Sequence, residues 1–237
     1  MDPISIDGTV EDIFDRDPTN RNYFGNLSSA TVFSDQHPAP LELDQYLASD
    51  DQLARSERWG TIIVVGQRDK YQITVDDLVV LASRWNMPGS AMEPLFSVSH
   101  SICRPGNLTF HSQAGYTWRH AVISLPPESA ADSPEDLHII QSFRLDANAG
   151  SDSLRAIVFC TSRWQDQITQ ITLEYSLKPN FDRVPILNST RFMMHILRPV
   201  VQKWSASTTN FNMTSVFLVS CTLLFHEGSQ LMTLSRC

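Results

Sequence analysis

Short runs of β-branched and aromatic residues recur along the chain, and most of them alternate between apolar and polar positions. The alternation is cleanest over residues 168–177, and it also marks residues 106–112 and 116–123. A period of two is typical of half-buried strands. Further strand-like runs occupy residues 59–65, 71–75, 137–145 and 154–160. The pattern predicts seven to ten short strands, with a hairpin over residues 59–75.

One segment, TVDDLVVLASRW, changes period from two to the spacing of a helix. Its apolar positions recur every three or four residues, which places them on one helical face: Val75, Leu78, Val79, Ala82 and Trp85. Thr74 is a suitable N-cap, and Asn86, Pro88 and Gly89 are suited to end the element. We therefore predict one helix of about three turns over residues 75–85.

The first 55 residues differ from the remainder in charge and in apolar content. They hold eleven acids and three arginines, which accounts for the whole formal charge of -8 and leaves the other 182 residues neutral. Their apolar residues are scattered, as in a segment that lies across another surface. We predict an extended acidic N-terminal arm over residues 1–55, and a disordered tail is the alternative for residues 1–20.

Together these elements predict an all-β protein with one or two short helices. Thirteen prolines and nine glycines separate the runs, and Pro126 with Pro127 is expected to end a strand. The simplest architecture is an antiparallel eight-stranded β-sandwich, a jelly roll, over residues 56–182. Residues 183–237 are expected to form a C-terminal extension that packs on the sandwich or on a neighbouring subunit.

The termini and the cysteines exclude several classes of protein. The acidic N-terminus lacks the apolar segment of a secretory signal, and the longest apolar run, at residues 216–225, has about half the length of a membrane helix. We expect no membrane span. The cysteines show no metal-binding spacing and are interpreted as free thiols, buried in strands for the first three: Cys103, Cys160, Cys221 and Cys237.

Candidate chemistry is sparse. His111 and His120 flank a strand turn, and Cys103 lies beside Arg104 with His100 three residues away. Sequence proximity along a strand does not bring a cysteine and a histidine within hydrogen-bond reach, so neither set predicts an active site. The tryptophans are spread one per element, which favours core and interface packing over ligand stacking: Trp59, Trp85, Trp118, Trp164 and Trp204. We predict no catalytic, cofactor-binding or metal-binding residues and no enzymatic activity.

The order of several short motifs resembles the capsid proteins of picorna-like positive-strand RNA viruses. In those jelly-roll subunits a helix precedes a strand that opens on a basic residue and glycine, the next strand ends in Pro-Pro, and the final strand runs into a motif ending in phenylalanine. The corresponding positions here are Arg104, Gly106, Pro126, Pro127 and Phe181. The resemblance covers about residues 59–182, and Pro105 departs from it by separating the basic residue from the glycine.

This resemblance implies a structural subunit of an icosahedral capsid that assembles with other capsid proteins around an RNA genome. The chain has no Lys/Arg block, so any RNA contact is expected to be weak. Partners would be other capsid subunits and a host receptor, in the virion and, during assembly, in the host cytoplasm. The alternative from the residues alone is a soluble β-sandwich binding module of lectin-like or small-ligand type.

Overall fold

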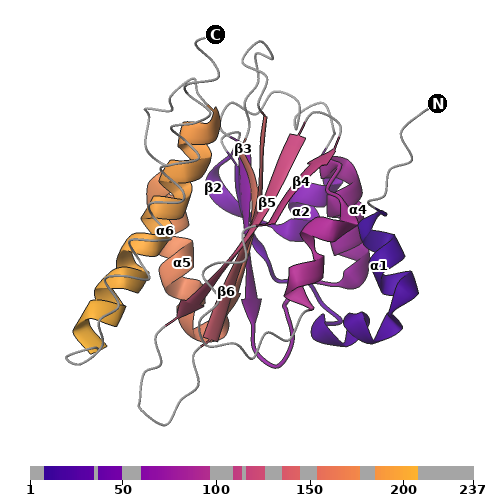
Figure 1. The fold of residues 1–237 in the computed structure, drawn as a ribbon, viewed down its shortest axis with the longest axis horizontal. Helices are drawn as coiled ribbons and strands as arrows, with labels where there is room; N and C mark the ends of the chain where they lie inside the picture. Colours follow the sequence, from indigo (N-terminus) through magenta and orange to yellow (C-terminus); the bar gives the residue numbers. More distant parts are fainter. Residues whose placement is uncertain are drawn as a thin grey trace.

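The protein folds around one mixed β-sheet with helices on both faces, as Figure 1 shows. The computed structural model describes residues 8–34, 37–49, 60–96, 109–113, 116–125, 135–144, 154–176 and 185–207. The sheet order is β2-β1-β3-β7-β6-β5-β4. The strands are β1 (Thr31–Ser34), β2 (His37–Glu42), β3 (Gly60–Gln67), β4 (Thr109–Gln113), β5 (Tyr116–Leu125), β6 (Glu135–Arg144) and β7 (Leu154–Thr161). The prediction of an all-β antiparallel jelly roll is therefore wrong.

Strands β3 and β7 form a parallel pair at the centre of the sheet. Both are apolar along nearly their whole length, because each face of the sheet is covered by helices. Gly60 begins β3 with φ 102°, and a Cβ there would lie 1.7 Å from the carbonyl oxygen of Leu154. The close approach of the two strands thus requires glycine at this position.

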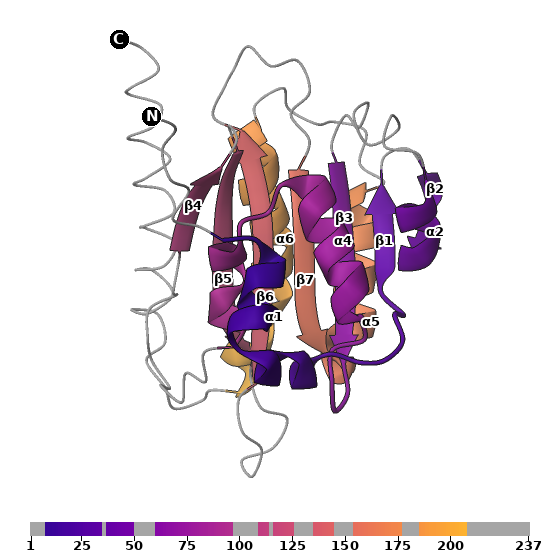
Figure 2. The ribbon, with the colours of Figure 1, turned by 90° about the vertical axis from the view of Figure 1, so that its right-hand side faces the viewer.

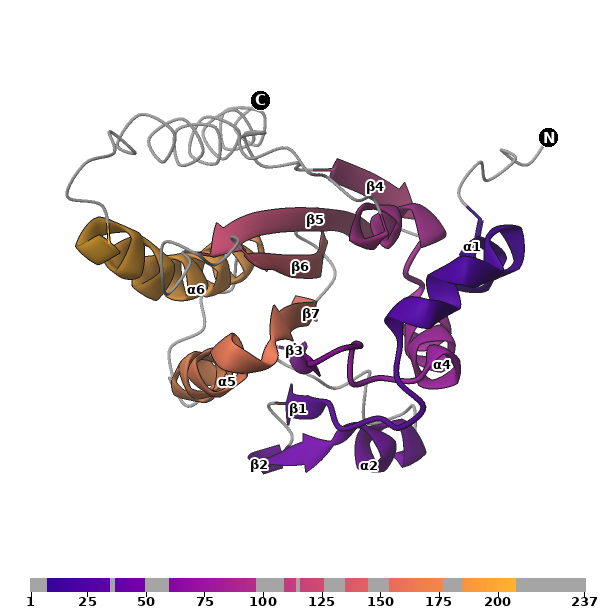
Figure 3. The same ribbon diagram turned by 90° about the horizontal axis from the view of Figure 1, so that it is seen from below.

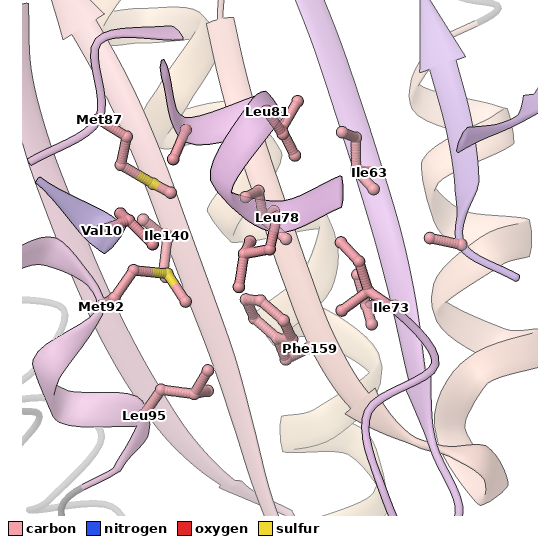
Figure 4. Packing of buried hydrophobic residues seen from close by; sticks show 14 of the residues in the cluster. Val10, Ile63, Ile73, Leu78, Leu81, Met87, Met92, Leu95, Ile140 and Phe159 are labelled. Atoms are coloured by element: carbon pink, nitrogen blue, oxygen red, sulfur yellow. The ribbon is translucent and has the colours of Figure 1, made fainter. Parts of the chain in front are cut away.

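The first face of the sheet is covered by short helices from the N-terminal half, which lie in front of the strands in Figure 2. They are α1 (Val10–Arg16), η1 (Pro18–Tyr23), α2 (Leu43–Ala48), α4 (Val75–Trp85), η2 (Gly89–Ala91) and η3 (Glu93–Leu95). Their apolar side chains join those of the sheet in one cluster, part of which Figure 4 shows. We call this set of helices, with their capping residues, the first layer.

The predicted N-terminal arm is not an arm. Strands β1 and β2 pair within the sheet, and Phe14, Val32 and Tyr46 are buried in the core of the protein. The predicted boundaries at residues 55 and 182 are wrong as well. The sheet spans residues 31–161, and α6, which follows residue 182, packs on the same sheet. The scattered apolar residues that suggest anchors on a neighbouring molecule instead pack on the chain's own sheet.

The second face carries two longer helices, α5 (Ser162–Ser176) and α6 (Pro185–Ser207), which lie opposite the first layer in Figure 3. Helix α5 occupies the segment predicted to be the cleanest strand, so that prediction is wrong. The residues of α5 that are buried recur every three or four positions: Trp164, Ile168, Thr172 and Tyr175. We call α5 and α6 together the second layer.

Several local predictions are confirmed. Helix α4 has the predicted bounds, with Thr74 as its N-cap and Asn86 in the left-handed conformation at its C-cap. Strands β4 to β7 coincide with strand-like runs of the sequence, and β5 ends at Leu125, directly before Pro126. The hairpin over residues 59–75 is wrong, because β3 pairs with β1 and β7, and Tyr71 makes only isolated bridges.

The described part of the predicted C-terminal extension is α6. It packs on the second face of the sheet through Phe192, Ile196 and Val200. None of the helices in the described ranges combines the length and the apolar character needed to cross a membrane.

Candidate functional site

Two histidines from neighbouring strands meet beneath the first layer. His120 lies on β5 and His138 on β6, and both side chains are buried. Nε2 of His120 lies 3.1 Å from Nδ1 of His138, and Nδ1 of His120 lies 2.8 Å from the carbonyl oxygen of Ala91 in η2. The pair therefore connects the sheet to the first layer through side chains rather than through a strand ladder.

The carbonyl oxygen of Ala91 fixes the tautomers of the neutral pair. A carbonyl oxygen only accepts, so Nδ1 of His120 carries the hydrogen and donates it to Ala91. Nε2 of His120 is then an acceptor, and Nδ1 of His138 donates to it. The chain of bonds leaves the proton-free nitrogen at Nε2 of His138, the outermost ring atom of the series.

Burial keeps His138 uncharged near neutral pH. It lowers the pKa of His138 to about 4, and the carboxylate of Asp136, two residues away on the same strand, opposes that shift. Asp136 itself accepts a hydrogen bond from Ser124 at 3.0 Å. The arrangement can respond to acid, since protonation of His138 would place a positive charge in an apolar layer.

Of the candidates named from the sequence, His120 alone has a described side chain in a polar cluster. His111 lies on β4, where its backbone pairs with Trp118, and nothing is established for its side chain. Cys103, Arg104 and His100 lie outside the described residues, as does Phe181. His138 is not predictable from local sequence, because only the β5–β6 register brings it beside His120.

Cys160 is free and buried, as predicted, and burial raises the pKa of its thiol to about 12. Such a thiol is not a nucleophile at neutral pH. Trp85, Trp118 and Trp164 are buried in the core, which confirms their predicted packing role. In the described part of the chain, no three His, Cys, Asp or Glu side chains are placed to hold a metal ion.

A second candidate site is the outer surface of α6. Arg191, Met194, Arg198 and Gln202 are exposed and follow one another at spacings of three, four and four residues, so they form a stripe along one side of the helix. Met194 is 38% exposed and is one of four exposed large apolar side chains among the described residues. We call these four residues the α6 stripe. It lies away from Phe192, Ile196 and Val200, which face the sheet.

No family model and no curated protein matches this chain. The fold and the two candidate sites are accordingly the only grounds for a functional proposal, and the resemblance to viral capsid proteins gains no support from relatives.

Proposed function

We propose that the protein is a structural subunit that acts by associating with further copies of itself, and that the α6 stripe forms part of the contact. The observation that carries the proposal is the composition of that stripe: two arginines flank an exposed methionine on a helix that contains no acidic residue. Arginine and methionine are enriched in protein interfaces relative to the remaining surface.

The geometry of α6 suits such a contact. The helix is 23 residues long, which corresponds to about 34 Å, and its outer side is therefore a long surface, although Pro199 lies inside the helix beside Arg198. Leu197 and Val201 are partly buried beside the stripe and add apolar area to it. A methionine side chain adapts its shape to the surface opposite, so an imperfect match is tolerated.

Self-association is the part of the capsid hypothesis that does not depend on a jelly roll, and it is the part that we retain. The icosahedral shell, the enclosed RNA genome and the host receptor follow from a fold that the protein does not have. They stay untested predictions, as does the alternative of a lectin-like or small-ligand binding module, and no feature of the described residues favours either.

Sedimentation velocity of the full chain over a wide concentration series tests the proposal. We expect the weight-average mass to rise with concentration, and the double variant Met194→Glu/Arg198→Glu to stay monomeric. Arg68→Glu, which reverses one exposed charge in the turn after β3, is the control and should associate normally. A wild-type chain that is monomeric at every concentration would overturn the proposal, as would unchanged association of the double variant.

A further inference from the structure

We propose that copies of the protein join head to tail, with α6 of one copy docked on the acidic first layer of the next. This inference rests on the proposed function and specifies the partner surface. It arises from the distribution of charge between the two faces of the sheet.

The second layer presents a basic helix. Helix α6 carries Arg191, Arg198 and Lys203 and no aspartate or glutamate. Lys203 lies over the ring of Trp164 at 4.3 Å, which holds it against α5, whereas Arg191 and Arg198 lie in the exposed stripe. The positive charge of α6 is therefore directed away from the sheet.

The first layer is acidic. Its helices and capping residues include three arginines, Arg16, Arg21 and Arg84, and nine acids: Glu11, Asp12, Asp15, Asp17, Glu42, Asp44, Asp76, Asp77 and Glu93. All of these acids except Asp77 are exposed. An excess of six carboxylates on one side of a small domain creates a negative field over that side.

The three arginines neutralise only part of the layer, and each of them already has partners. Arg16 pairs with Glu93 at 3.5 Å and Arg21 with Asp15 at 3.8 Å, while Arg84 donates to the carbonyl oxygens of Tyr46 and Leu47. Within the described ranges, ion pairs are lacking at six exposed acids of the layer, of which Asp12 and Asp17 accept hydrogen bonds at the helix starts. The other four are Glu11, Glu42, Asp44 and Asp76. These carboxylates are available to a cation from another molecule.

Within the described residues, α6 of one copy does not reach the acids of the first layer of that same copy. The acidic layer and α6 lie on opposite faces of the same sheet, as Figure 3 shows. A two-fold contact between two α6 helices would bring arginines of both copies together, and a contact between two first layers would oppose carboxylates. Head-to-tail docking alone places opposite charges in contact, and it generates a ring or a filament.

Charge reversal on each surface tests the arrangement. Arg191→Glu/Arg198→Glu changes the stripe, and Glu42→Arg/Asp44→Arg changes the first layer. We expect each variant alone to self-associate at least about tenfold more weakly than the wild type, because like charges then face each other. Mixing the two should restore association, since the reversed stripe of one then meets the reversed layer of the other.

The control is Asp166→Arg/Glu174→Arg on α5, which alters the net charge by the same amount as the first-layer variant. Its association should match the wild type, and a loss would overturn the inference by showing that total charge governs the equilibrium. Circular dichroism and thermal melting establish that each variant is folded. Added salt should weaken the wild-type contact by screening.

The outcomes separate the inference from the function on which it rests. If Glu42→Arg/Asp44→Arg associates like the wild type while Arg191→Glu/Arg198→Glu does not, α6 is a contact surface but the head-to-tail arrangement is wrong. Failure of the mixture to associate would also overturn the arrangement. A wild-type chain that never associates would overturn both.

Discussion

The two faces of the sheet are covered by helices of different kinds. On the first face, α1 and α2 have only 7 and 6 residues, and α4 has 11. On the second face, α5 and α6 have 15 and 23. Helices shorter than about 12 residues are marginal in water by themselves. The first layer must therefore take its stability from contacts with the sheet, whereas the second layer has helices long enough to present an outer surface as well.

The contacts of the first layer are correspondingly dense and specific. Phe14 packs edge-on against Phe24 with ring centroids 5.5 Å apart, and Tyr71 packs against Phe159 of β7 at 5.0 Å. Arg155, also on β7, donates to the carbonyl oxygen of Trp85 at the C-terminal end of α4. A cation at this end of a helix is favoured by the helix dipole. Short elements are thus held by aromatic packing and by polar bonds that reach across from the strands.

The largest effect should come from truncating the buried side of each layer. Trp85 on α4 and Phe192 on α6 are both fully buried, and replacement of either by alanine should lower the free energy of unfolding by about 3 to 5 kcal/mol. Val80 and Met194 lie on the exposed sides of the same helices, and alanine there should change it by under about 0.5 kcal/mol. Urea unfolding followed by tryptophan fluorescence or circular dichroism measures all four. A harmless Phe192→Ala would show that α6 does not depend on the sheet as α4 does.

The same contrast explains which elements the sequence can predict. Helix α4 and strands β5 to β7 are predicted closely, because α4 has strong capping signals and the strands have β-branched runs bounded by turn formers. Strand β3 is predicted as a strand but with the wrong neighbour. The apolar residues of β3 point to both faces of the sheet, which is typical of a strand buried in a mixed sheet. For β3, this feature is a better guide to its neighbours than the alternation of other strands.

Helix α5 shows how a clean alternation can mislead. Ile171, Leu173 and Tyr175 alternate with polar residues, yet only Tyr175 of these three is fully buried. The side chains that pack on the sheet include Trp164 and Ile168, which extend the pattern backward at helical spacing. A window that begins at Trp164 contains both periods, and the length of the segment then favours the helix.

The candidate sites are less predictable than the fold. The His120–His138 pair depends on the register of β5 against β6, which no local pattern specifies. The charge contrast between the layers is visible in part, because the excess of acids in the first 55 residues is plain from the sequence. Its consequence is not, since only the sheet pairing of β1 and β2 places these acids on one face of the protein instead of on an arm.

The second prediction concerns the polar bond that ties the first layer to the sheet. The pKa of His138 is about 4 in the folded protein and is 6.5 for an exposed histidine. The unfolded chain therefore binds more protons between these values, so the stability contributed by neutral His138 is complete above pH 6.5 and is lost as the pH falls toward 4. The loss at pH 4 should be about 3 kcal/mol from this group.

Unfolding free energies measured at intervals from pH 7 to pH 4 test the prediction. The variant His138→Asn retains a donor near Nδ1 but cannot titrate, so its stability should fall less steeply over this range than that of the wild type. The carboxylates contribute equally to the pH dependence of both proteins, so their contribution cancels in the comparison. If the two proteins lost stability in parallel, protonation of His138 would not be the cause of the loss at low pH. The contact between the first layer and the sheet would then not be sensitive to acid through His138.

The smallest effect concerns the caps on which the short helices depend. The hydroxyl of Thr74 accepts from the amide of Asp77 at 3.1 Å and donates to its carboxylate at 2.7 Å, which closes the first turn of α4. Thr74→Ala should cost about 1 kcal/mol, and Thr74→Ser, which keeps the hydroxyl, should cost only a few tenths.

The matched position in the second layer is Thr169, in the interior of α5, where it is only partly buried. Alanine has the higher helix propensity, so Thr169→Ala should be neutral or slightly stabilising in the same urea assay. Equal costs at Thr74 and Thr169 would mean that the loss of a threonine, rather than of a cap, determines the result. A loss of stability at Thr74 alone would show that the first layer depends on the N-caps of its short helices. Each of these helices has too few turns to compensate for an uncapped end.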